Sequence, residues 1–141
     1  MKKITWSILT LLIASGCILS ACALNGTSAG LAGTSWKLVS YGPVGSQIPA
    51  APGVETSVDF CGDGRVSGKL GCNSFSGNYE VKDKRIVFSS MVSTLMACPE
   101  PQMKQEITAF QVMTGTVRFQ VEGDRLTIYD ASGASAITLS R

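Results

Sequence analysis

The sequence predicts a mainly β domain of the α+β class, in which a curved antiparallel sheet or small barrel is accompanied by one α-helix. Three observations favour this fold class. The chain has 15 glycines and 5 prolines in 141 residues, which indicates many turns. Several short runs alternate apolar and polar residues, as strands with one buried face do. One run, after Pro99, instead repeats its apolar residues at helical spacing.

The first 21 residues have the pattern of a secretion signal. Two lysines precede an apolar run that reaches Leu19, and small residues follow it. This run is interrupted and short for a membrane span, which needs about 20 apolar residues. Its end, Leu19-Ser20-Ala21-Cys22, resembles the lipobox of bacterial lipoproteins. That resemblance implies cleavage before Cys22, diacylglycerol on the Cys22 sulfur and acylation of the new amino group.

We therefore expect a signal peptide over residues 1–21, a flexible tether over residues 22–32 and a folded domain over residues 33–141. Two acyl anchors hold a protein on a membrane stably where one is marginal. Ala23 stands where an Asp would retain a Gram-negative lipoprotein, which resembles default sorting to the outer membrane. The expected location is the periplasm-facing side of that membrane, or the cell-membrane exterior in other bacteria. Lipidation at Cys17, an ordinary cleaved signal and an uncleaved anchor are the alternatives.

The first half of the domain consists of short predicted strands joined by glycine-rich turns. The run from 34 to 41 places Trp36 and Leu38 on one side, which fits an opening strand. A loop rich in Gly and Pro follows over residues 42–53. Four further strands, the first two of them paired as a hairpin, are predicted over residues 56–60, 66–70, 75–81 and 85–90.

One helix of about three turns is expected after Pro99. The apolar residues that recur at helical spacing, and that predict its buried face, are Met103, Ile107, Phe110 and Met113 or Thr114. The polar residues expected to face elsewhere are Lys104, Gln105 and Glu106. A three-strand meander over residues 117–121, 126–128 and 137–139 completes the domain. A barrel would close the edges of such a sheet, with the helix as a plug or lid.

The residues that most enzymes need are missing. The 141 residues contain no histidine, which removes Ser-His and Cys-His nucleophile activation and the commonest metal ligand. A carboxylate pair remains open, but the candidate acids stand where solvated turns or exposed faces are expected. These acids are Asp59, Asp63, Glu80 and Glu106. We therefore expect a protein that is not an enzyme and that holds neither a metal nor a cofactor.

The distribution of charge argues against a nucleic-acid partner. The chain has 12 Lys and Arg against 10 Asp and Glu, and loss of Lys2 and Lys3 with the signal peptide balances the two. Only Lys82, Lys84 and Arg85 cluster, around one turn, so no phosphate-binding surface is indicated. The expected partners are the membrane, through the N-terminal anchor, and a lipid, a peptide or another envelope protein.

Three cysteines remain after the lipid site, namely Cys61, Cys72 and Cys98. They form no C-x-x-C motif, so neither a thioredoxin-like redox site nor a paired zinc knuckle is indicated. In an oxidising envelope we expect one disulfide and one spare thiol. The sequence alone permits all three pairings.

Several motifs lie in order along the chain: GTSWKL (33–38), Phe60 with DGRVSG (63–68), GCNSFSGNY (71–79), STLMAC (93–98), and Glu106 with Phe110. Together they span essentially the whole domain and resemble the META domain, the HslJ-type family of bacterial envelope proteins. The most distinctive motif is the third, which contains Gly71, Cys72, Asn73, Gly77 and Tyr79.

This resemblance implies a lipocalin-like or broken β-barrel with one helix, related in shape to secretin pilotin lipoproteins. It also implies a structural disulfide between Cys72 and Cys98. Cys61 departs from the family pattern, where a polar residue commonly precedes the Gly-rich turn. Family members are associated with heat shock and novobiocin resistance, which implies a stress-related accessory protein that supports outer-membrane integrity. A pilotin-like or inhibitory partner of another envelope protein or secretion component is the alternative.

Two sets of side chains leave a binding role open. Asn73 and Asn78 lie in the most distinctive motif, although amides beside glycines more often bond the local backbone. The larger apolar side chains would line a pocket or, as is commoner, fill the core. These are Trp36, Phe75, Tyr79, Phe88 and Phe110.

Overall fold

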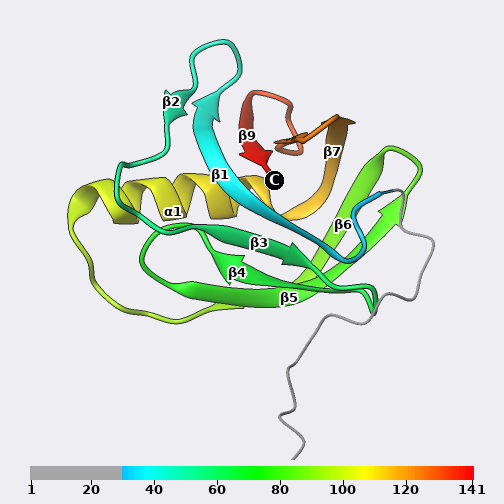
Figure 1. Cartoon of the computed structure of the whole chain (residues 1–141), viewed down its shortest axis with the longest axis horizontal. Coiled ribbons are helices and arrows are strands. Elements are labelled where there is room, and N and C mark those ends of the chain that lie inside the picture. The colour runs from blue at the N-terminus through cyan, green and yellow to red at the C-terminus, as the bar shows by residue number, and fades with distance from the viewer. Residues whose placement is uncertain (1–29) are drawn as a thin grey trace, which may run out of the picture.

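The computed structural model describes residues 30–141, which form nine strands and one helix (Figure 1). The strands are β1 (Thr34–Pro43), β2 (Ile48–Pro49), β3 (Ser57–Phe60), β4 (Arg65–Lys69), β5 (Ser74–Lys82), β6 (Arg85–Ser93), β7 (Gly115–Glu122), β8 (Arg125–Tyr129) and β9 (Ser135–Ser140). The helix α1 (Glu100–Val112) lies between β6 and β7. The predicted signal peptide, Cys22 and residues 22–29 of the predicted tether lie outside the described residues.

The strands form one antiparallel sheet that closes on itself. Neighbours in the sheet follow the order β2-β1-β3-β4-β5-β6-β7-β8-β9, and β1 also pairs with β9. The closing pairing runs from Lys37 opposite Ser140 to Pro43 opposite Ser135. β1 and β3 to β9 therefore make an eight-stranded barrel, and β2 is a short addition to the edge of β1. The prediction of a mainly β barrel with one helix is confirmed.

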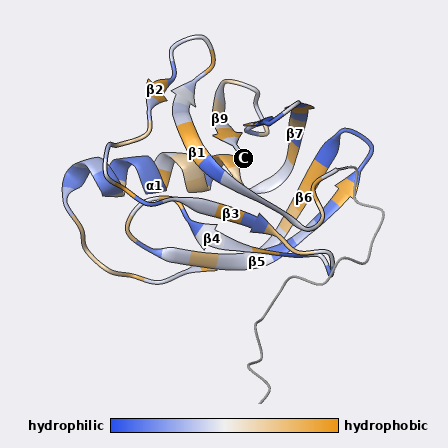
Figure 2. Cartoon of the chain, in the orientation of Figure 1, coloured by the Kyte–Doolittle hydropathy of each residue, from blue (hydrophilic) through white to orange (hydrophobic). Residues whose placement is uncertain are grey.

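Alternation of apolar and polar residues along the strands fills the barrel with side chains. Trp36, Phe60, Ile86, Leu126 and Ile137 are completely buried and come from five different strands. Hydrophilic residues gather instead at the turn between β5 and β6 and at the start of α1 (Figure 2). Burying one face of every strand in this way is the main source of the barrel's stability.

The folded part of the chain begins before the predicted boundary at residue 33. Leu31 is completely buried within the hydrophobic core. The backbone N–H of Gly33 donates to the carbonyl oxygen of Phe60 at 2.7 Å, which joins this segment to the end of β3. Leu31 therefore belongs to the barrel.

The helix buries a different face from the one that its apolar spacing predicted. It begins after Pro99, packs against β1 and β9, and buries Gln105, Glu106, Ala109 and Val112. Ile107 is 51% exposed. The prediction that Gln105 and Glu106 face away from the protein is wrong, because both side chains bond parts of the barrel that lie far away in the sequence.

Candidate binding groove

The most distinctive motif forms the turn between β4 and β5 and holds the segment that leads to the helix. Cys72 and Cys98 are joined by a disulfide with their Cα atoms 5.9 Å apart, which is the pairing that the family resemblance implies. The bond ties the turn to the residue just before Pro99, where α1 starts. One end of the β6–α1 connection is therefore fixed to the barrel covalently.

Asn73 fixes the same connection through hydrogen bonds. Its Oδ1 accepts from the backbone N–H of Met96 at 2.6 Å and from Thr94 Oγ1 at 2.9 Å. Its Nδ2 donates to the carbonyl oxygen of Met96 at 3.2 Å and to Glu106 Oε1 at 2.7 Å. Since the backbone N–H of Asn73 donates to Glu106 Oε2, both carboxylate oxygens are satisfied. Asn73 thus links the barrel, the connecting segment and the helix.

Gln105 and Gly71 complete the contacts that hold the helix against the barrel. Gln105 Nε2 donates to the carbonyl oxygen of Leu70 at 2.6 Å, and its Oε1 accepts from the backbone N–H of Ala51 at 2.6 Å. A Cβ added at Gly71 would lie 2.9 Å from Glu106 Cβ and against the carbonyl oxygen of Gln102. The close approach of turn and helix therefore requires glycine at this position.

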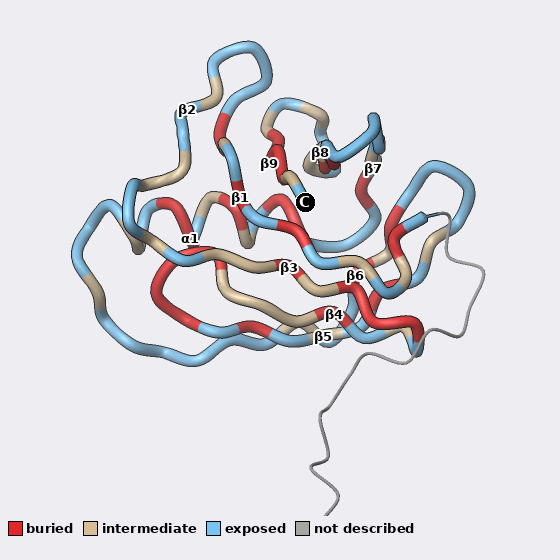
Figure 3. The backbone as a smooth tube through the Cα atoms, in the orientation of Figure 1, coloured by how far each residue is buried: buried red, intermediate tan, exposed pale blue. Residues whose placement is uncertain are grey.

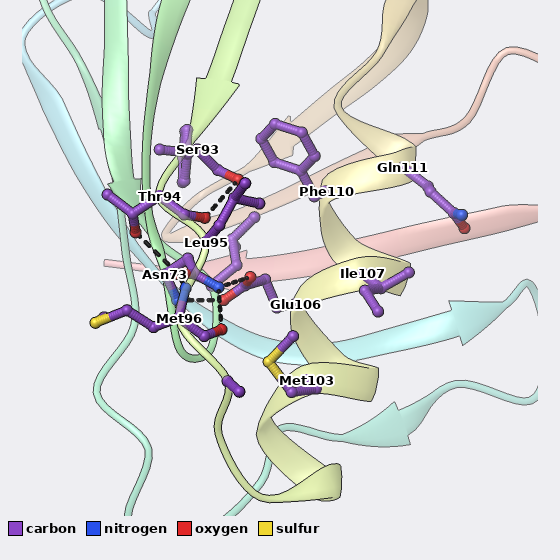
Figure 4. A pocket seen from close by; sticks show the side chains of 13 residues that line it. Asn73, Ser93, Thr94, Leu95, Met96, Met103, Glu106, Ile107, Phe110 and Gln111 are labelled. Carbon is purple, nitrogen blue, oxygen red and sulfur yellow. Dashed lines mark hydrogen bonds between the residues drawn. The ribbon is translucent and has the colours of Figure 1, made fainter.

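An apolar groove of about 460 Å³ lies between α1 and the segment that follows β6. We call it the α1–β6 groove, and its lining is Leu70, Asn73, Phe75, Ser93, Thr94, Leu95, Met96, Ala97, Met103, Glu106, Ile107, Phe110 and Gln111. Figure 4 shows Ser93, Thr94, Leu95 and Met96 on one side and Met103, Ile107, Phe110 and Gln111 along the helix on the other. The apolar spacing of α1 is therefore used to line this groove.

The rim of the α1–β6 groove exposes apolar side chains. Leu95 is 96% exposed, Met96 56% and Ile107 51%, and the neighbouring Val92 is 61% exposed. These are four of the eight exposed large hydrophobic residues in the described range. The connection between β6 and α1 is exposed along most of its length (Figure 3). Clustered exposed apolar residues are typical of binding surfaces.

The predicted aromatic set divides between core and groove. Trp36, Tyr79 and Phe88 are buried in the core of the barrel. Phe75 and Phe110 line the groove and meet edge to face, with ring centroids 5.9 Å apart. Three of the five aromatic side chains therefore fill the core, and the other two line the groove.

The rest of the distinctive motif lies along β5 and supports the barrel. Tyr79 Oη donates to the carbonyl oxygen of Cys61 at 2.8 Å, and its ring packs edge to face on Phe60. Gly77 lies against Met91, whose sulfur a Cβ at this position would meet. Asn78 is exposed on the same strand. These positions do not line the groove.

Cys61 is buried at the end of β3, beside the Gly-rich turn. Its backbone N–H donates to the carbonyl oxygen of Arg65 at 2.8 Å. Its sulfur is disulfide-bonded, so the expectation of a spare thiol among the three cysteines is wrong.

Two described carboxyl groups outside the groove have a shifted pKa. A hydrogen bond from the Arg65 side chain lowers the pKa of Asp63 in an exposed turn. At Asp130 burial opposes ionisation, but hydrogen bonds from Ser132 and the backbone of residues 133–135 outweigh it and lower the pKa.

Residues 30–141 contain no group of three or more acidic or cysteine side chains placed to hold a metal. The helix in this range is too short and polar to cross a membrane.

Sequence reasoning missed the rim residues Leu95 and Met96 as binding candidates. The available signal was a run of apolar residues, from 95 to 97, in a segment with neither strand nor helix periodicity. Such a run is expected to be buried or to face a partner. Glu106 was recognised within the family motif but assigned to an exposed face.

Comparison with known proteins gives the fold and the family. A protein from Burkholderia xenovorans solved by NMR is 22% identical, has a TM-score of 0.66, and is matched over 79% of this chain and 83% of its own. A second NMR structure is 20% identical, with a TM-score of 0.59 and coverage of 75% of this chain and 86% of its own. These identities show a shared fold alone, and no curated protein matches the chain. The META domain model matches residues 29–141, which include the whole of the described range, so the chain belongs to the META domain family.

Proposed function

We propose that this META domain protein is a non-enzymatic, lipid-anchored binding protein of the bacterial envelope, which takes up an apolar group in the α1–β6 groove. The observation that carries the proposal is an exposed apolar groove clamped by a disulfide and by the Asn73–Glu106 bonds. A rigid, preformed site loses little conformational freedom on binding. The lipobox ending at Cys22 supports the anchor.

The absence of histidine from the sequence supports a binding role over catalysis. Among the described acids, Glu106 is the one that lines the groove, and both of its carboxylate oxygens already accept bonds from Asn73. Both oxygens thus hold the turn at Asn73 against the helix, which favours a structural role for this carboxylate. The proposed role is support of outer-membrane integrity under stress, including tolerance to antibiotics of the novobiocin type.

The groove is tested with an uncharged apolar dye, 1-N-phenylnaphthylamine, whose fluorescence rises in apolar surroundings. The protein is the mature chain, residues 22–141, with Cys22→Ser, Cys61→Ser and an ordinary export signal, so that no acyl group, detergent or additional thiol interferes. We expect saturable binding that Ile107→Glu weakens at least about tenfold, because it places a charge on the apolar wall. Val44→Glu is the matched control, since Val44 is 50% exposed and lies outside the groove. Equal binding by both variants would overturn the groove as the site.

The anchor is tested by the intact mass of the full-length protein extracted from its own membranes. We expect a chain that begins at Cys22 and carries three acyl groups. A chain with an unmodified N-terminus, or with Cys22 in a disulfide instead of a thioether, would overturn the anchor.

The exposed rim also favours a second candidate, a pilotin-like or inhibitory partner of another envelope protein. Leu95 projects almost fully into solvent at 96% exposure, which suits contact with a protein surface more than enclosure of a small molecule. A stable complex with one envelope protein that survives washing with apolar dye, and that Ile107→Glu disrupts, would favour this candidate.

A further inference from the structure

Strand β6 is longer than the partner that covers its outer edge. β5 pairs with β6 as far as Ser93, but β7 pairs with it only from Arg85 to Phe88. Within residues 30–141 no strand therefore covers the outer edge of residues 89–93. An uncovered edge presents backbone N–H and C=O groups that can pair with another extended chain.

This uncovered edge ends at the α1–β6 groove. After α1 the chain returns to β6 as β7, whose first residue, Gly115, pairs with Phe88. Ser93, at the end of the edge, lines the groove, and Phe110 and Ile107 lie on the facing helix (Figure 4). A strand edge beside a helix forms a slot in which an extended peptide can satisfy its backbone and bury side chains.

Of the usual devices that prevent strand pairing, this edge carries only one bulge. Natural edges are commonly protected by lysine, proline or a bulge. Residues 89–93 read Ser-Ser-Met-Val-Ser and contain neither lysine nor proline. Ser90 has a positive φ of 52° at an irregularity, but pairing is regular again where Val92 and Ser93 face Ser76 and Phe75. The end nearest the groove is thus available for pairing.

The lining selects an uncharged, apolar segment. Glu106 is the ionisable residue that lines the groove, and its oxygens are held by Asn73. The helix wall is apolar at Met103, Ile107 and Phe110. A charged side chain placed here would lose water without gaining a partner.

The start of the described chain favours a polypeptide over the acyl chains of the bilayer. The described chain begins at the opposite end of the molecule's long axis from the start of α1 (Figure 1). The eight residues from Cys22 to Gly30 reach at most about 28 Å when fully extended. A tether of this length would keep that end of the domain within about 28 Å of an anchor at Cys22, whereas the start of α1 lies at the far end of the domain.

We propose that the α1–β6 groove binds an extended segment of another envelope polypeptide, which adds to the edge of β6 as a strand and lays alternate apolar side chains against Ile107 and Phe110. The inference rests on the proposed function, because it names the occupant of the same groove. Backbone hydrogen bonds between the peptide and β6 supply the affinity, and the apolar walls of the groove select the side chains of the peptide.

The test begins with phage-displayed random heptapeptides selected against the same mature chain with Cys22→Ser and Cys61→Ser. The strongest peptide is then synthesised in three forms: unmodified, with one alternate set of amides N-methylated, and with the other set N-methylated. In a strand, alternate amides face opposite edges. We therefore expect one methylated form to bind at least about tenfold more weakly and the other to bind within about threefold. Amide hydrogen exchange at residues 91–93 should slow when the unmodified peptide binds.

The outcomes separate this inference from the function on which it rests. Equal binding of both methylated forms, or no enriched peptide while the dye still binds, would overturn strand addition and leave the apolar groove standing. Failure of both peptide and dye to bind would overturn both. Displacement of the dye by palmitate but by no selected peptide would identify an acyl chain as the occupant and refute the inference. Ile107→Glu should abolish peptide binding, whereas Val44→Glu should preserve it.

Discussion

Replacing Asn73 with alanine should release the helix and the β6–α1 connection together. The side chain is 3% exposed and makes four hydrogen bonds, to Thr94, to Glu106 and to both backbone groups of Met96. Alanine removes all four and leaves the Glu106 carboxylate with one backbone donor. The groove would lose the contact that fixes its two walls relative to each other.

The expected loss in free energy of unfolding depends on the groups that lose their hydrogen bond to Asn73. A bond to a charged group contributes about 1.5–3 kcal/mol and a neutral bond about 0.5–1.5 kcal/mol. Thr94 and Met96 are exposed and regain water, so their bonds add little, whereas Glu106 is only 9% exposed. We therefore expect Asn73→Ala to lower the free energy of unfolding by about 3 kcal/mol.

Urea denaturation without reductant measures this cost, because the slope m should stay constant while the midpoint falls. Asn78→Ala is the matched control from the same motif. Asn78 is exposed, so its replacement should change the free energy of unfolding by less than about 0.5 kcal/mol. A loss below about 1 kcal/mol at Asn73, or equal losses at both positions, would refute the proposed linking role.

Three further substitutions test other parts of the site. Replacing both Cys72 and Cys98 with serine should cost about 3.5 kcal/mol on the chain-entropy model, given their sequence separation of 26, and unchanged urea stability would contradict it. Gly71→Ala should cost about 2 kcal/mol by pushing α1 from the turn, and a thermal midpoint equal to that of the wild type would exclude such close packing. Asp130 has a pKa below its ordinary value of 3.8, so its contribution is present above that pH and is lost as the pH falls through the folded-state pKa. Asp130→Asn should therefore destabilise the protein at pH 6 but much less near pH 3, and a difference that stays constant with pH would argue against the hydrogen-bonded carboxylate.

Local patterns in the sequence were sufficient to predict most strands. Period-two alternation reports which face of a strand is buried, so the runs around Trp36, Phe60, Ile86 and Leu126 were recognised without tertiary information. The closing pairing of β1 with β9 could not be predicted in this way. It joins Lys37 to Ser140, and no local pattern specifies which distant strands meet.

The buried face of α1 shows why the groove could not be predicted. Spacing identified Met103, Ile107 and Phe110 as one face, which is correct, but burial of that face was inferred from hydrophobicity alone. The helix instead buries Gln105 and Glu106, whose partners are 35 and 33 residues away at Leu70 and Asn73. Polar side chains are buried when such partners exist, and their positions are known only from the fold.

The most direct test of the account is the sensitivity to novobiocin of a strain that lacks the gene, complemented with Ile107→Glu or Val44→Glu protein expressed at equal levels. Wild type and Val44→Glu should restore tolerance, whereas Ile107→Glu should not, because Ile107 lines the α1–β6 groove and Val44 lies outside it. Full restoration of tolerance by Ile107→Glu would contradict the claim that this protein works through its apolar groove.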